Sequence, residues 1–140
     1  NATLIEGSDG LRTRRLLVDC GLGVRQLAAR LDQAGLAWSD IEAIFITHEH
    51  SDHIGCARSI ALKHRIPIWM SHGTHAALGS PDFNGLLRIA HDLEPIDLGC
   101  WQATPFTVPH DAREPLQLRC TDGAVHLGIL TDLGHASEHV

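Results

Sequence analysis

The hydrophobic positions in the first half of the chain follow two periods in turn, which predicts alternating strands and helices. Four apolar residues recur at the i, i+3, i+4, i+7 spacing of one helical face: Val24, Leu27, Ala28 and Leu31. Gly35 is suited to end that helix. Short apolar runs are typical of strands, and longer mixed segments of helices. We therefore expect strands over residues 2–6, 14–19, 43–47 and 66–70, and helices over 54–65 and 74–78.

The second half has a different pattern, in which predicted strands follow one another directly. Turn-forming residues at 81–85 mark a loop, and four apolar runs follow it, over residues 94–98, 101–108, 116–121 and 125–131. Asp122-Gly123 between the last two runs predicts a hairpin. Strands alternating with helices, followed by strands in series, predict an α/β protein with mixed sheets, in one domain over residues 1–140.

Composition narrows the class of protein further. The 140 residues are 44% hydrophobic and 20% charged, an ordinary globular mixture. No apolar run is long enough to cross a membrane and no signal peptide is recognisable, so we expect no membrane partner. The net charge of −6 argues against a broad basic surface for nucleic acid. The four cysteines form no CxxC pair, which favours reduced thiols and a cytoplasmic location.

Histidine is the outlier, with 11 copies, and four potential metal ligands lie within six residues. His48, His50, Asp52 and His53 directly follow the apolar run at 43–47. In an extended backbone His48 and His50 point to the same side and could share one ion, whereas Asp52 and His53 could serve a second. Imidazole and carboxylate without thiolate favour zinc, with manganese or iron as alternatives.

Two more candidate ligands follow later predicted strands. His110 comes after the run at 101–108, and Asp132 after the run at 125–131. Binding groups collect at such strand ends in α/β proteins. Either residue alone would more often be an ordinary loop residue, but together with the histidine cluster they complete a pattern.

This pattern resembles a known family. The segment THEHSDHIG at 47–55 resembles the signature of the metallo-β-lactamase superfamily, and Asp19 in VDCG, His110, and Asp132 in LTDLG are similar to its first, third and fourth motifs. LLVDCGLG, FITHEHSDHIG and VPHDAREP resemble the WalJ-like (YycJ-like) branch, and the resemblance covers nearly the whole chain. It implies an αββα sandwich with a dinuclear metal site at one edge.

The resemblance also implies a role for each candidate. The implied ligands are His48, His50 and His110 for one divalent ion, Asp52 and His53 for the other, and Asp132 bridging the two. A water between the ions would lose its proton near neutral pH and become a nucleophile, which Asp52 would orient. Asp19 would hold a ligand through hydrogen bonds. His135 would contact phosphate or donate a proton, unless it is an ordinary loop histidine.

These roles predict a metal-dependent hydrolase of an anionic ester. The positive charge of two divalent ions exceeds the negative charge of two carboxylates and a bridging hydroxide. The site would therefore stay positive in an acidic chain and attract a phosphodiester. The resemblance points to DNA and to exonuclease activity. The alternatives are a thioester or lactam hydrolase on the same core, and a catalytically silent domain that binds metal structurally.

The chain also departs from the family pattern. A strand and a turn rich in glycine and serine usually precede the position of Asn1, and a last histidine ligand usually lies beyond the position of Val140. We therefore expect a fragment of a longer protein, with one ligand of the second ion missing.

Overall fold

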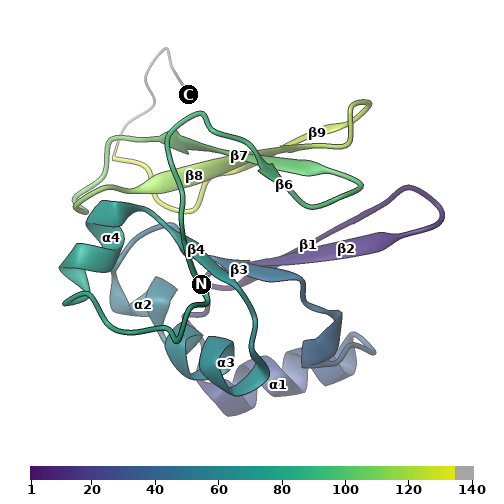
Figure 1. The fold of residues 1–140 in the computed structure, drawn as a ribbon, viewed down its shortest axis with the longest axis horizontal. Helices are drawn as coiled ribbons and strands as arrows, with labels where there is room; N and C mark the ends of the chain where they lie inside the picture. The colour runs from purple at the N-terminus through teal and green to yellow at the C-terminus, as the bar shows by residue number, and fades with distance from the viewer. Residues whose placement is uncertain (135–140) are drawn as a thin grey trace.

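Two β-sheets lie face to face, and helices cover the face of the first sheet that points away from the second (Figure 1). The computed structural model describes residues 1–134. The first sheet has the order β1 (Thr3–Ser8), β2 (Thr13–Val18), β3 (Ala43–Phe45), β4 (Ile68–Met70), β5 (Leu87–Ile89). The second has the order β6 (Ile96–Asp97), β7 (Gln102–Thr107), β8 (Leu116–Thr121), β9 (His126–Ile129).

The pairing within the sheets is mixed, as the sequence predicts. β1 and β2 form an antiparallel hairpin, while β2, β3, β4 and β5 run parallel to one another. All pairs in the second sheet are antiparallel, including β8 and β9, which the turn at Asp122-Gly123 connects. The α/β class and the hairpin are therefore confirmed.

The helices lie in the connections of the first sheet. They are α1 (Val24–Gln33), a 3₁₀ turn (Trp38–Asp40), α2 (Ser51–Ile54), α3 (Ala57–His64) and α4 (His72–Ala77). α1 buries Leu27 and Leu31, and Gly35 follows its last turn with a φ of 72°, as the helical spacing predicts. No helix within residues 1–134 covers the outer face of the second sheet, and none there is long and apolar enough to cross a membrane.

The parallel strands are buried on both faces, which explains their uninterrupted apolar runs. Alternate side chains of β2 and β3 point to opposite faces. Leu17 and Ile44 join the core under the helices, while Leu16 and Phe45 join the core between the sheets. Trp101 completes the second core from the opposite sheet and donates a hydrogen bond from its ring to the backbone of the first sheet.

Two local details differ from the sequence-based expectation. The helix predicted over residues 54–65 is divided, because Gly55, with a φ of 34°, ends α2, and α3 begins at Ala57. β5 was not predicted, because two of its three residues are only partly buried, Arg88 is exposed, and the segment becomes a strand through pairing with β4. The four cysteines are all free.

Gly21 provides a test of how the fold holds the segment around α2. The loop after β2 packs on that segment, where the Cys20 N–H donates to the His53 carbonyl at 2.7 Å. A Cβ at Gly21 would overlap the Asp52 carbonyl oxygen, so Gly21→Ala must displace backbone. We expect a loss of about 1–3 kcal/mol in the free energy of unfolding, measured by denaturant titration.

Gly128→Ala is the matched control, because a Cβ there meets no atom within 4 Å and the backbone is not left-handed. It should leave stability unchanged or raise it by about 0.4–1 kcal/mol. Equal effects of the two substitutions would contradict this account of the packing against α2.

Candidate metal centre

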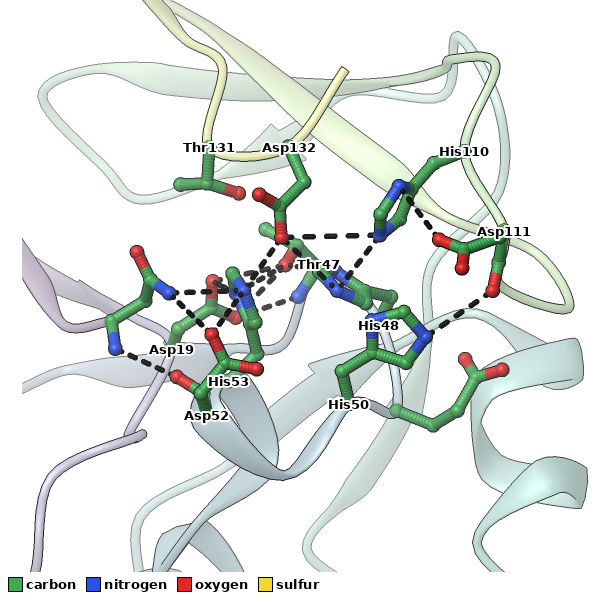
Figure 2. A network of polar contacts seen from close by, with 12 residues as sticks. Asp19, Thr47, His48, His50, Asp52, His53, His110, Asp111, Thr131 and Asp132 are labelled. Atoms are coloured by element: carbon green, nitrogen blue, oxygen red, sulfur yellow. Dashed lines mark hydrogen bonds and ion pairs between the residues drawn. The ribbon is translucent and has the colours of Figure 1, made fainter. Parts of the chain in front are cut away.

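Segments that follow strands of both sheets meet at one edge of the sandwich (Figure 2). From the first sheet come Asp19 after β2, and the run from Thr47 to His53 after β3, which ends in α2. From the second come His110 after β7 and Asp132 after β9. The Leu116 N–H donates to the Thr47 carbonyl at 2.9 Å and joins the two sheets beside the site.

The first group of converging ligand atoms belongs to three histidines. One ring nitrogen from each of His48, His50 and His110 lies within 4.8 Å of the other two. The Nε2 atoms of His48 and His110 are 3.2 Å apart. Two nitrogens bound to one tetrahedral zinc ion at 2.0–2.1 Å would be about 3.3–3.4 Å apart. The spacing and the all-nitrogen donor set therefore fit a zinc-sized cation.

The second group contains His48, His53 and Asp132. Asp132 Oδ2 lies 2.8 Å from His53 Nε2, 3.4 Å from His48 Nε2 and 3.8 Å from His110 Nε2. One carboxylate oxygen thus lies beside a histidine outside the first group and two histidines within it. This arrangement has the geometry that a bridging carboxylate requires.

Asp52 lies at the solvent side of the second group. Its Oδ2 atom is 3.4 Å from His53 Nε2, and its side chain is 66% exposed. The side-chain amide of Asn1 donates to this oxygen at 2.9 Å and lies 3.0 Å from His53 Nε2. The amide therefore sits between two atoms predicted to hold the second ion, a contact that sequence analysis missed.

Beneath the histidines, Asp19 collects hydrogen bonds in a fully buried position. It accepts from the Thr47 backbone N–H at 2.9 Å and from the Thr47 hydroxyl at 2.9 Å, and His53 Nδ1 donates to it at 2.7 Å. Asp19 has a left-handed backbone with a φ of 62°, which aspartate tolerates better than most residues. The strain is offset by the hydrogen bonds that this turn allows.

His50 and His110 of the first group each have one ring nitrogen that faces Asp111. His50 Nε2 lies 3.2 Å from the Asp111 carbonyl oxygen, which only accepts, so this nitrogen carries the proton and Nδ1 is left free. His110 Nδ1 is 3.2 Å from a carboxylate oxygen of the same residue. The Arg113 N–H donates to Glu49 at 2.8 Å and ties this loop to the histidine cluster.

The neighbouring rings of His48 and His53 have opposite pKa shifts. Burial, together with the positive charge that His53 and His110 can carry, lowers the pKa of His48 to about 4. Burial also acts to lower the pKa of His53, but the hydrogen bond and charge of Asp19, with the charges of Asp52 and Asp132, outweigh it and raise this pKa. His48 is consequently neutral at pH 7, the form that binds a metal ion.

The structure brings together all six predicted ligands and Asp19, and it adds Asn1, Thr47 and Asp111. Thr47 and Asp111 each lie next to a predicted ligand, within segments that carry the family resemblance, but the sequence did not assign either a role. Asn1 is 51 residues from Asp52 and is next to no predicted ligand in the sequence. His135 lies outside the described residues.

Comparisons with known proteins identify the family of this chain. The family model of the metallo-β-lactamase superfamily matches residues 1–140. The exodeoxyribonuclease YycJ of Bacillus anthracis is 30% identical over 136 residues, covering 94% of this chain and 51% of the relative. The exodeoxyribonuclease WalJ of Streptococcus pneumoniae is 30% identical over 132 residues, covering 91% and 49%. The chain spans about half the length of these curated relatives.

Among solved structures, the Rm3 metallo-β-lactamase superposes with a TM-score of 0.69 at 18% identity, covering 91% of this chain and 54% of that one. This likeness concerns the fold. Because the family model matches residues 1–140, the chain belongs to the metallo-β-lactamase superfamily.

Proposed function

We propose that the protein is a metal-dependent phosphodiesterase that acts on DNA. It would use two divalent ions at the edge of the sandwich, with zinc as the preferred metal. One observation carries the proposal: Asp132 Oδ2 lies within 3.8 Å of the Nε2 atoms of three histidines, so that one carboxylate oxygen faces both groups of candidate ligands. Ions about 3.5–4 Å apart are typical of enzymes that cleave phosphate esters.

In this proposal each side chain has a defined task. The first ion would be held by His48, His50 and His110, the second by His53 and Asp52, and Asp132 would contact both. When bound, the ions supply a water that ionises near neutral pH and positive charge for the transition state. The exposed carboxylate of Asp52 would orient that water. His135 remains a candidate for contact with the substrate.

Two further observations support an anionic substrate. Two divalent ions would form a local positive centre in a chain whose net charge is −6, and an anion would bind at that centre rather than to the surface as a whole. The two relatives are named exodeoxyribonucleases, which favours DNA over a thioester or a lactam. Such an activity, with four free cysteines, fits a cytoplasmic protein.

Turnover of small substrates tests the reaction class. With zinc or manganese added, the intact protein should hydrolyse bis(p-nitrophenyl) phosphate and single-stranded DNA faster than a thioester or a β-lactam, measured as kcat/KM. A chelator should abolish hydrolysis, and re-addition of the metal should restore it. Faster hydrolysis of the thioester would contradict the proposed substrate class, and no hydrolysis with metal bound would indicate a structural site.

Metal titration tests the two ligand groups. Zinc added to the chelator-stripped chain should bind in one tight and one weaker event, because three histidines form the first group. The second ion would instead depend on Asp52, whose side chain is largely exposed. A proton on His53 competes with the second ion. Because the pKa of His53 is raised, the weaker event should fade as the pH drops through that raised value. Two equally tight events would contradict the inequality of the groups.

Substitution of the carboxylates separates the two positions. Asp132→Ala should weaken both binding events, because Asp132 faces both groups, whereas Asp52→Ala should weaken mainly the second. Isothermal titration with zinc measures both effects. Asp32→Ala, on the exposed side of α1, is the control and should change neither. Unchanged stoichiometry and affinity in Asp132→Ala would show that Asp132 is no ligand.

A further inference from the structure

Thr47 lies in the middle of the polar contacts among the candidate ligands (Figure 2). Its side chain is fully buried. The hydroxyl oxygen is 2.9 Å from Asp19 Oδ2, 2.9 Å from His48 Nδ1 and 3.4 Å from His53 Nδ1. A threonine that only filled space would not need three polar neighbours.

The number of protons available determines the direction of each hydrogen bond. The carboxylate of Asp19 can only accept, and Thr47 has one hydroxyl proton, which it donates to Asp19. The same oxygen therefore has lone pairs, and no second proton, to offer to His48. Consequently His48 Nδ1 is the donor in the 2.9 Å contact. His53 Nδ1 donates to Asp19 directly at 2.7 Å.

The alternative proton position on His48 faces a strong acceptor. His48 Nε2 lies 3.4 Å from Asp132 Oδ2, so a proton on Nε2 would be attracted by that carboxylate. Such a proton would occupy the lone pair that points toward His110 Nε2 and the first ion position. The ring of His48 thus has an acceptor on each side, Thr47 at Nδ1 and Asp132 at Nε2.

We propose that Thr47 is a positioning residue whose hydroxyl relays the charge of Asp19 to His48 and thereby keeps the proton of His48 on Nδ1 and its Nε2 free for the metal. One buried carboxylate then holds the Nδ1 proton of two candidate ligands, that of His53 directly and that of His48 through Thr47. The importance of this tautomer for metal binding rests on the proposed function, but the tautomer itself does not.

The tautomer can be observed without metal. In the chelator-stripped intact protein, ¹⁵N NMR at pH 7 should show His48 protonated on Nδ1. In Thr47→Val, which keeps the shape and removes the hydroxyl, the proton should move to Nε2 and leave His53 unchanged. Thr47→Ser keeps a hydroxyl at this position and should show the same His48 signal as the unsubstituted protein. Thr74→Val is the matched control, because Thr74 is equally buried and hydrogen-bonded, in α4.

Zinc affinity provides the second measurement. Thr47→Val should lower the affinity of the tight event by about 10–100-fold, as loss of a hydrogen bond to a ligand typically does, while Thr47→Ser and Thr74→Val stay close to the unsubstituted protein. Asp19→Asn should change the NMR signals of both His48 and His53, whereas Thr47→Val should change that of His48 alone. Asp19→Asn also provides a second test if Thr47→Val does not fold.

Three outcomes would overturn the proposal: His48 keeping its proton on Nδ1 in Thr47→Val, Thr47→Ser losing as much affinity as Thr47→Val, or Asp19→Asn leaving the His48 signal unchanged. If the unsubstituted protein binds no zinc while the tautomer responds as expected, the proposed function fails and the relay stands.

Discussion

The buried carboxylate of Asp19 is the interaction on which the rest of the site depends. A charge that water cannot reach is costly unless donors surround it, and here the donors are the backbone and hydroxyl of Thr47 and the ring of His53. These bonds hold together the loop after β2, the end of β3 and α2. The left-handed backbone of Asp19 is the local strain that accompanies this arrangement.

The charges around that carboxylate give two adjacent histidines different chemistry. Burial acts to lower the pKa of both rings. At His53 the hydrogen bond and charge of Asp19, with the charges of Asp52 and Asp132, outweigh burial and raise the pKa. At His48 the charges of neighbouring histidines add to the effect of burial, and the pKa falls to about 4. Both rings are fully buried, so the difference comes from their neighbours and not from exposure. At neutral pH His48 is ready to bind an ion, while a proton competes more strongly at His53.

The candidate metal centre needs both sheets, because neither one carries all of its candidate ligands. The first sheet supplies His48, His50 and His53, and the second supplies His110 and Asp132. The core between the sheets and the backbone bond between Leu116 and Thr47 set their separation. These side chains converge only after the sheets have packed. A bound metal ion would therefore stabilise the folded state relative to the unfolded chain.

The sequence by itself determined the features that depend on short-range order. The spacing of His48, His50, Asp52 and His53 after an apolar run placed four candidate ligands at a strand end, and helical spacing with Gly35 determined α1. The order of strands and helices was sufficient for the α/β class. Each of these follows from the geometry of a single strand, turn or helix.

Only the tertiary structure decided which atoms face one another. It made a strand of residues 87–89 by pairing them with β4, brought Asn1 to Asp52, and placed one oxygen of Asp132 among three histidines. It also determined which ring nitrogen of His48 and His50 is free, since that depends on acceptors at Thr47 and Asp111. Contacts between distant segments depend on how two sheets pack, and no local period in the chain records that packing.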